Sequence, residues 1–178
     1  HWADNSLAVL ATVQALGGDM DASAAALATL PGLPGRGAVH VIPWGNGNIR
    51  LIDDSYNANP ESMNAALQTL GQMPKDGGRR VAILGDMLEL GDISKAAHAA
   101  LESAIAKNSV DVAYLAGHQM KALAGALPAA TLGGIADTAD ELLPMVLSGL
   151  KAGDIVTVKA SNGIGLSRIV KILTDPAA

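Results

Sequence analysis

Residues 48–71 read NIRLIDDSYNANPESMNAALQTLG and contain a strand, a polar loop and a helix in direct succession. The apolar start of this stretch predicts the strand. Asn59 is a suitable helix cap, Pro60 suits the first helical position, and Glu61 places an acid in the first turn. The apolar residues that follow recur at helical spacing, which predicts a helix over about 60–71 with one buried face. That face carries Met63, Ala66, Leu67 and Leu70.

The residues before this unit predict a β-hairpin. The segments AVHVIPW at 38–44 and NIRLIDD at 48–54 flank a turn-forming cluster, Gly45-Asn46-Gly47. We therefore expect the main domain to begin with two antiparallel strands.

Strands and helices alternate through the rest of the chain. This alternation predicts an α/β fold, in which a mostly parallel sheet is covered by helices on both faces. The predicted strands are RRVAIL at 79–84, VDVAYLA at 110–116, a weak strand near Thr131, and DIVTVKA at 154–160. The predicted helices lie at 94–107, 118–127, 137–148 and 165–173.

A short helical segment precedes the main domain. Residues 3–16 have apolar residues at helical spacing, and Gly17-Gly18 ends that helix. A second, alanine-rich helix is predicted over 21–30, followed by the linker PGLPGRG at 31–37. We therefore predict two parts, 1–37 and 38–178. Because the chain starts at His1 without an initiator methionine, we interpret it as a fragment or a processed chain.

The composition excludes several classes of function. A net charge of -5 with only 12 basic residues argues against nucleic-acid binding, which needs a basic footprint. The absence of cysteine excludes disulfides, thiolate metal sites and cysteine nucleophiles, and it fits a reducing cytosol. No apolar run reaches the roughly 18 residues that span a bilayer, so no membrane partner is expected.

Three polar loops follow predicted strands. They are DDSYNAN at 53–59, GDMLELG at 85–91 and KASNG at 159–163. In an open parallel sheet, ligands bind outside the carboxyl ends of the strands. All three loops are therefore expected along one edge of the sheet, where carboxylates, amides, a hydroxyl and a lysine would converge.

Each of these residues also has a purely structural interpretation. Asp, Asn and Ser after a strand are commonly turn formers and helix caps, which explains Asn59 fully and Ser161 in part. The ammonium of Lys159 is as readily placed in solvent as in a binding site. Gly85 and Gly163 are explained by tight turns alone.

The sequence lacks other catalytic signatures. It contains no GxxxxGK[ST] phosphate loop, no GxGxxG after a strand and no GxSxG elbow. The histidines are scattered without metal-ligand spacing, at His1, His40, His98 and His118. The chain alone therefore shows no complete catalytic apparatus and no metal site.

Four motifs resemble the Mur ligase family, in its D-alanyl-D-alanine-adding branch. DDSYNANPESMNAAL at 53–67 resembles the start of the C-terminal domain of that family. LGDMLELG at 84–91, with His98 downstream, and IVTVKASNGIGLSRIV at 155–170 resemble the same branch. HWADNSLAVLATVQALG at 1–17 resembles the end of the central ATPase domain. The resemblance thus implies a Rossmann-like C-terminal domain, preceded by the last helices of the central domain.

The resemblance also implies a reaction. ATP would convert the carboxylate of UDP-N-acetylmuramoyl-tripeptide into an acyl phosphate, and the amine of D-alanyl-D-alanine would displace the phosphate. This would occur in the cytoplasm during peptidoglycan precursor synthesis. The phosphate loop, the Mg²⁺ ligands and a carbamylated lysine would belong to the central domain, which is missing from this chain together with the N-terminal domain. The fragment alone is therefore expected to be inactive.

Site residues are implied position by position. Asn5 matches an adenine contact, Arg36 a linker arginine that reaches the nucleotide, and Asp54 the acid that holds the ribose hydroxyls. A carboxylate suits that role because it can accept two hydroxyl hydrogen bonds. The resemblance also implies residues that bind substrate; these are Tyr56, Asn57, Asn59, Lys159, Ser161 and Asn162.

Two other functions remain open. The chain length and the strand–helix alternation also suit a stand-alone α/β module that binds a nucleotide or another ligand without catalysis. An independent small enzyme that uses Asp54 or Asp86 as an acid or base is the third possibility, although no partnered nucleophile or metal set supports it.

Overall fold

The computed structural model describes residues 2–29 and 33–175. The chain divides into two compact units, His1–Gly32 and Leu33–Ala178. These compact units differ from domains in the evolutionary sense, so the predicted domain boundary between residues 37 and 38 stays a prediction. Each unit is described separately below.

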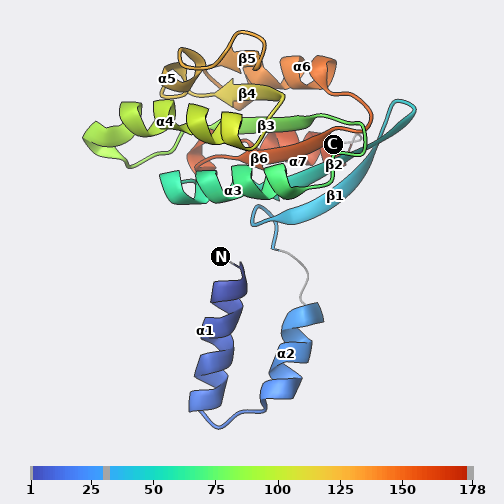
Figure 1. The fold of residues 1–178 in the computed structure, drawn as a ribbon, viewed down its shortest axis with the longest axis vertical. Coiled ribbons are helices and arrows are strands. Elements are labelled where there is room, and N and C mark those ends of the chain that lie inside the picture. Colours follow the sequence, from blue (N-terminus) through green and yellow to red (C-terminus); the bar gives the residue numbers. More distant parts are fainter. Residues whose placement is uncertain (1, 30–32, 176–178) are drawn as a thin grey trace. The chain divides into compact units, whose positions relative to one another are not determined.

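In the described residues, six strands form one sheet in the order β1-β2-β6-β3-β4-β5 (Figure 1). β1 pairs antiparallel with β2, and all other neighbouring pairs are parallel. The predicted mostly parallel sheet with an initial hairpin is therefore confirmed. The strands span Ala38–Trp44 (β1), Gly47–Asp54 (β2), Arg80–Gly85 (β3), Val112–Ala116 (β4), Leu132–Ala136 (β5) and Ile155–Lys159 (β6).

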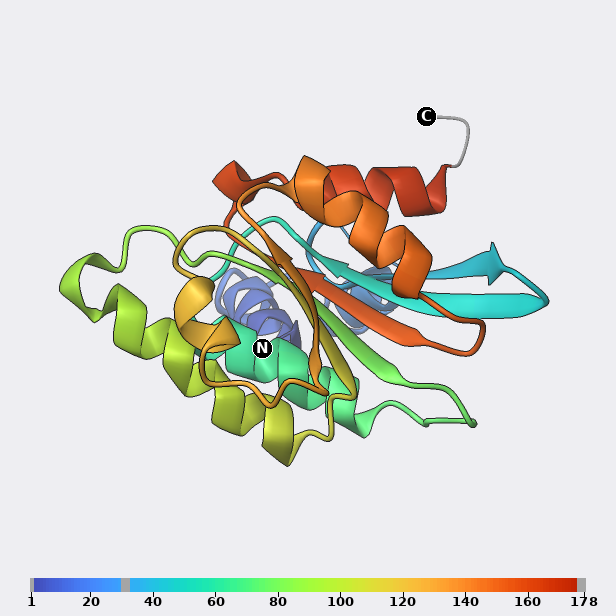
Figure 2. The same ribbon diagram turned by 90° about the horizontal axis from the view of Figure 1, so that it is seen from above.

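Helices cover both faces of this sheet, as predicted. α3, α4 and α5 lie against one face, and α6 and α7 against the other (Figure 2). The helices span Pro60–Gln72 (α3), Ser94–Lys107 (α4), Lys121–Ala124 (α5), Ala139–Gly149 (α6) and Ser167–Thr174 (α7). Short 3-10 turns occupy Gly91–Ile93 (η1) and Asn162–Ile164 (η2).

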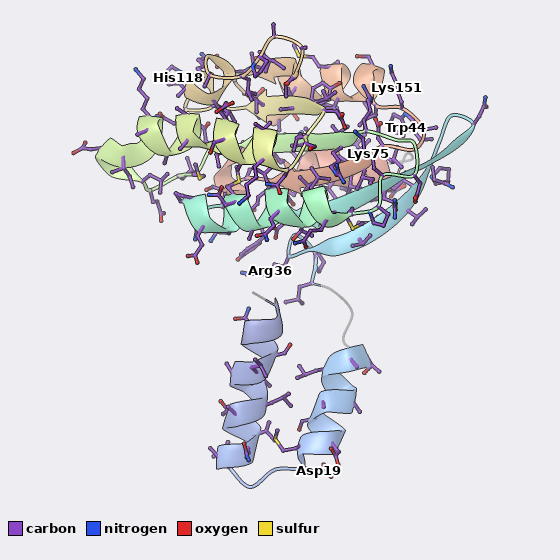
Figure 3. The ribbon with its side chains drawn as sticks, viewed as in Figure 1. Asp19, Arg36, Trp44, Lys75, His118 and Lys151 are labelled. Atoms are coloured by element: carbon purple, nitrogen blue, oxygen red, sulfur yellow. The ribbon has the colours of Figure 1, made fainter. Side chains whose placement is uncertain are left out.

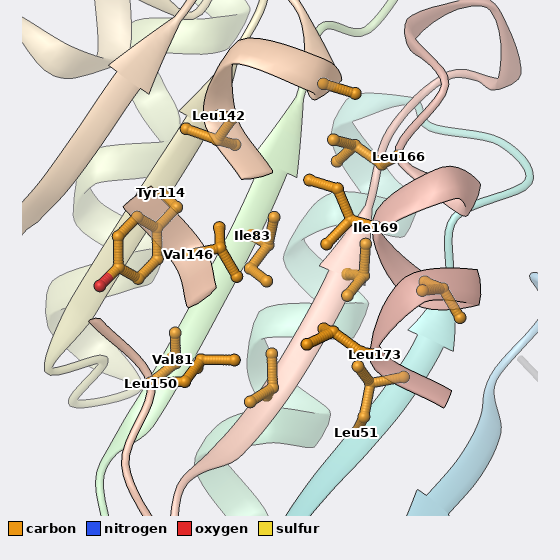
Figure 4. Packing of buried hydrophobic residues seen from close by; sticks show 14 of the residues in the cluster. Leu51, Val81, Ile83, Tyr114, Leu142, Val146, Leu150, Leu166, Ile169 and Leu173 are labelled. Carbon is orange, nitrogen blue, oxygen red and sulfur yellow. The ribbon is translucent and has the colours of Figure 1, made fainter. Parts of the chain in front are cut away.

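Each face of the sheet has its own apolar core. On one face, Ile83 of β3 packs in a cluster with Leu142 of α6 and Ile169 of α7 (Figure 4). On the other face, Leu84 of β3 packs in a cluster with Leu67 of α3. Adjacent residues of one strand enter opposite cores because side chains alternate along a strand. This burial on both faces explains why the central strands β3 and β4 consist almost entirely of apolar residues.

The start of α3 is set by Asn59 and Pro60, the residues from which this helix was predicted. The side chain of Asn59 accepts a hydrogen bond from the Ser62 N–H at 2.8 Å, and Ser62 Oγ accepts one from the Asn59 N–H at 3.0 Å. This reciprocal pair is a capping box, with Pro60 at the first helical position. The cap interpretation of Asn59 is therefore confirmed.

The predicted helix over 118–127 is mostly wrong, because only α5 is helical there. The carboxylate of Asp86 accepts the backbone N–H groups of Gln119 and Met120, at 3.0 and 2.8 Å. These residues form a turn that a distant loop fixes. The chain leaves the helix at Gly125, shortly before Pro128.

The first unit consists of two helices, as predicted. α1 spans Trp2–Ala15 and α2 spans Met20–Thr29, while the predicted end of the second helix at Leu30 lies outside the described residues. Gly17 adopts a φ of 73°, which suits glycine at the end of a helix. Within residues 2–29 and 33–175, no helix has the length and apolar character needed to cross a membrane.

The second half of the predicted linker is bound to the sheet. The Gly35 N–H donates to Asp53 Oδ2 at 2.8 Å, and the Gly37 N–H donates to the Asp53 carbonyl at 2.7 Å. Residues 31 and 32 lie outside the described residues. The segment that carries Arg36 is therefore held at the end of β2.

Candidate functional site

The three polar loops meet at one edge of the sheet, as predicted. They follow β2, β6 and β3, which are neighbours in the sheet and parallel. The Ser161 N–H donates to the Asp86 carbonyl at 3.1 Å, and the Leu88 N–H donates to Ser161 Oγ at 2.9 Å. Lys159 Nζ donates to the Asn57 carbonyl at 2.8 Å. The β6 loop thus contacts both of its neighbours.

A buried ion pair joins the first and third loops. Lys159 Nζ lies 2.7 Å from Asp54 Oδ2, and the two side chains are 3% and 19% exposed. The interpretation that places the Lys159 ammonium in solvent is therefore wrong. Burial raises the pKa of Asp54 above its ordinary value, although the hydrogen bond and charge of Lys159 act in the opposite direction.

The two adjacent aspartates have different surroundings. Asp53 Oδ1 accepts from the N–H and the hydroxyl of Ser55 at 3.2 and 2.6 Å, and its Oδ2 accepts from Gly35. Among the described residues, Asp54 has one partner side chain, Lys159, which binds Oδ2. Asp54 Oδ1 is therefore the acceptor that remains for a ligand at the end of β2.

A cation–aromatic pair lies beside these aspartates in the chain. The Arg36 guanidinium carbon is 4.4 Å from the centroid of the Tyr56 ring, which is within the range of a cation–π interaction. Tyr56 is 49% exposed, and its backbone N–H donates to the Gly35 carbonyl at 3.0 Å. Arg36 itself is exposed and lies just before β1 (Figure 3). The pair presents a flat, positively charged surface to solvent.

Ser161 holds the loop after β3 and does not cap a helix. It precedes η2, yet its side chain makes no capping hydrogen bond there. Its hydroxyl instead accepts from the Leu88 N–H and lies 3.5 Å from the Ala58 carbonyl. Ser161 therefore connects all three loops, and the capping interpretation of this residue is wrong.

His98 holds the same loop from the opposite side. Its Nε2 accepts the Met87 N–H at 2.9 Å, so Nδ1 carries the proton and donates to the Ser94 carbonyl at 2.7 Å. The side chain is completely buried. In this tautomer His98 is neutral, so it forms no ion pair with Asp86, although Nε2 lies 3.9 Å from Asp86 Oδ1.

Asp86 is used for structure. It is buried, and its two carboxylate oxygens accept the backbone N–H groups of Met120 and Gln119. The Asp86 N–H donates to the Ala116 carbonyl at 3.2 Å. Because Asp86 is buried and both of its oxygens bind backbone N–H groups, the geometry gives no support to Asp86 as an acid or base.

A cavity of about 440 Å³ opens between the three loops. Its walls include three of the predicted substrate amides and the predicted serine, together with the loop after β3. The lining residues are Asn57, Ala58, Asn59, Leu88, Glu89, Leu90, Ser161, Asn162 and Gly163. A second cavity of about 440 Å³, between α3 and α4, contains none of the predicted residues.

The structure thus brings most predicted residues together and adds others. Arg36, Asp54 and Tyr56 lie at the end of β2, and the remaining substrate residues lie in or beside the cavity. Asn5 belongs to the first unit, in α1. Sequence reasoning missed the structural roles of Asp53 and His98. The spacing of His98 four residues after Ser94, on one helix face, was the available signal for its bond to that residue.

Comparisons with known proteins agree with these motifs. A family model described as "Mur ligase, glutamate ligase domain" matches residues 40–162. The UDP-N-acetylmuramoyl-tripeptide--D-alanyl-D-alanine ligase of Rickettsia prowazekii is 34% identical over 170 residues, which cover 96% of this chain and 36% of that protein. The ligase of the same name from Escherichia coli is 40% identical over 126 residues, covering 71% of this chain and 26% of that protein.

Solved structures of similar proteins share the fold. MurF from Acinetobacter baumannii has a TM-score of 0.78 and 28% identity, covering 97% of this chain and 37% of that chain. MurF ligase from Thermotoga maritima, solved in complex with ADP, has a TM-score of 0.72 and 26% identity, covering 93% and 36%. This chain therefore spans little more than a third of the length of these relatives.

Proposed function

Because the chain belongs to the Mur ligase family, we propose that it is the carboxyl-terminal part of an ATP-dependent ligase that joins D-alanyl-D-alanine to UDP-N-acetylmuramoyl-tripeptide. The reaction passes through an acyl phosphate and belongs to cytoplasmic peptidoglycan precursor synthesis. The same name is carried by the relatives from Rickettsia prowazekii and Escherichia coli.

The observation that carries this proposal is the convergence of the three loops on one cavity. The loops after β2, β3 and β6 are joined by the Lys159–Asp54 ion pair and the Ser161 hydroxyl. A ligase must bring together a nucleotide, an activated carboxylate and an amine. This edge of the sheet presents carboxylate, guanidinium, amide and hydroxyl groups, and it would form one side of such a site.

The end of β2 serves the nucleotide in this proposal. Asp54 Oδ1 accepts hydrogen bonds from the ribose hydroxyls, while Lys159 holds Oδ2 and fixes the carboxylate. Arg36, stacked on Tyr56, contributes positive charge toward the phosphates. The adenine contact of Asn5, which lies in α1 of the first unit, stays a prediction from the resemblance. Support for nucleotide use comes from the ADP complex of the Thermotoga maritima relative.

The cavity serves the incoming amine substrate. The amides of Asn57, Asn59 and Asn162 line it together with Ser161, and they offer both donors and acceptors to a dipeptide. Tyr56 directly precedes Asn57 in the same loop but does not line the cavity, so its contact with the substrate stays a prediction. Lys159 acts by holding the Asn57 carbonyl in place.

We propose that the magnesium ligands of the full-length ligase lie outside this chain. In residues 2–29 and 33–175, no three His, Cys, Asp or Glu side chains are grouped closely enough to hold a metal ion. We therefore assign no step through a metal to these residues. The sequence also lacks a phosphate loop, so activation of the carboxylate requires residues beyond residues 1–178.

Phosphate release by the full-length protein tests the proposed function. We expect release that depends on ATP, the UDP-linked tripeptide and D-alanyl-D-alanine together, and no ATP turnover by residues 1–178 alone. Turnover of ATP to ADP by residues 1–178 above background would show that the missing domains are dispensable. Release by the full-length protein that is indifferent to D-alanyl-D-alanine would refute the assigned amine substrate.

A further inference from the structure

The loop after β3 contains a strained turn at the edge of the cavity. Glu89 adopts a φ of 64°, in the left-handed region that a residue with a side chain rarely occupies. Such a conformation costs free energy and persists only where the surrounding structure enforces it. Glycine, which adopts it without strain, occupies position 91 of the same loop with a φ of 55°.

Two buried side chains enforce this turn. His98 accepts the N–H of Met87, and Ser161 accepts the N–H of Leu88, so the two residues before Glu89 are bonded to different elements. His98 belongs to α4 and Ser161 follows β6. A loop fixed in this way presents Glu89 at one place on the cavity wall.

Glu89 is chemically distinct among the residues that line the cavity. It is the one ionisable side chain among them, beside amides, a hydroxyl and apolar groups. Among the described residues, the Glu89 carboxylate has neither a hydrogen-bond partner nor an ion pair. The nearby charges of Asp54 and Lys159 offset each other in their ion pair. Glu89 therefore supplies the one carboxylate on the wall of this cavity.

We propose that the Glu89 carboxylate binds the ammonium group of the incoming amine substrate, and that His98 and Ser161 are the positioning residues that present it. This inference rests on the proposed function, since it names the group that recognises the amine in the same cavity. A carboxylate forms strong, charge-assisted hydrogen bonds with an ammonium group. The apolar side chains of Leu88 and Leu90, on either side of Glu89, suit the small methyl groups of a substrate such as D-alanyl-D-alanine.

The test is steady-state kinetics of the full-length ligase with Glu89→Gln, which keeps the shape of the side chain and removes its charge. We expect the KM for D-alanyl-D-alanine to rise about 10-fold or more, as the loss of a charge-assisted hydrogen bond implies. The KM for ATP should stay within about twofold of the wild-type value, because Asp54 and Arg36 are unchanged. Glu89→Asp, which retains the charge with a shorter reach, should recover part of the loss.

Glu141→Gln is the matched control, because it removes the same charge from an exposed position on α6, on the other face of the sheet. It should leave both KM values unchanged. An unchanged KM for D-alanyl-D-alanine in Glu89→Gln, in an otherwise active ligase, would overturn the role of Glu89 and leave the proposed function standing. A wild-type protein that releases no phosphate with D-alanyl-D-alanine would overturn both.

Discussion

Replacing Lys159 with methionine removes the buried cation that joins two of the loops. Lys159 Nζ makes two hydrogen bonds, at 2.7 Å to Asp54 Oδ2 and at 2.8 Å to the Asn57 carbonyl. Methionine retains most of the apolar stem and loses both bonds. The two acceptors are then left without their donor, in a region where Lys159 is only 3% exposed.

The structure gives the size of the expected loss. Breaking a buried pair by removing one partner costs about 3–5 kcal/mol. Asp54 is 19% exposed and can be partly solvated, so we expect about 2–3 kcal/mol here. With a urea m-value of about 2 kcal/mol per molar for a domain of this size, the unfolding midpoint should fall by about 1–1.5 M.

Urea unfolding of the chain, followed by circular dichroism, measures this change. Lys95→Met is the control, because Lys95 is exposed on α4 and pairs with no acid among the described residues. A double-mutant cycle with Asp54→Ala should give a coupling free energy of about 1–2 kcal/mol. A loss below about 0.5 kcal/mol for Lys159→Met, with no coupling to Asp54, would refute the proposed stabilisation of the loops by this pair.

Three further predictions concern stability. Thr157→Val should leave the free energy of unfolding unchanged or raise it by up to about 1 kcal/mol, because the buried Thr157 hydroxyl has no hydrogen-bond partner among the described residues; a lower Tm would contradict this. Glu89→Gly should raise the stability by about 1 kcal/mol in thermal unfolding, because it relieves the left-handed conformation, while Glu89→Ala should not. Burial acts to raise the pKa of Asp111, but hydrogen bonds from Lys75 and the Arg80 N–H outweigh it, so the pKa is lowered. This carboxylate therefore stabilises the fold above its ordinary pKa of 3.8, and the contribution is lost as the pH falls through the lower folded value. Asp111→Asn should flatten the stability profile below the ordinary pKa of 3.8, and an unchanged profile would contradict the assignment.

The fold follows from local sequence to a large extent. The cap at Asn59 and the proline after it place the start of α3, and the capping box in the structure shows why. The turn-forming residues at 45–47 indicate where the hairpin turns, and the apolar strands indicate which residues form the two cores. These features depend on residues close together in the chain, so local patterns are enough to predict them.

Other features depend on residues far apart in the chain. Lys159 is buried because Asp54 lies 105 residues earlier, and no local pattern distinguishes such a lysine from one in solvent. The turn before α5 replaces the predicted helix because Asp86 binds its N–H groups from 33 and 34 residues away. The sequence was enough to predict that this edge of the sheet is a site. It was not enough to predict which of the side chains there are available to a ligand and which stabilise the loops.

The central claim is that this edge of the sheet forms one side of a nucleotide site, and Asp54→Ala in the full-length ligase tests it most directly. Losing a charged hydrogen-bond partner costs about 1.5–3 kcal/mol, which corresponds to a rise of about 10- to 150-fold in the KM for ATP. We predict that rise together with a smaller change in the KM for D-alanyl-D-alanine. An unchanged KM for ATP in a folded, active variant would contradict the account.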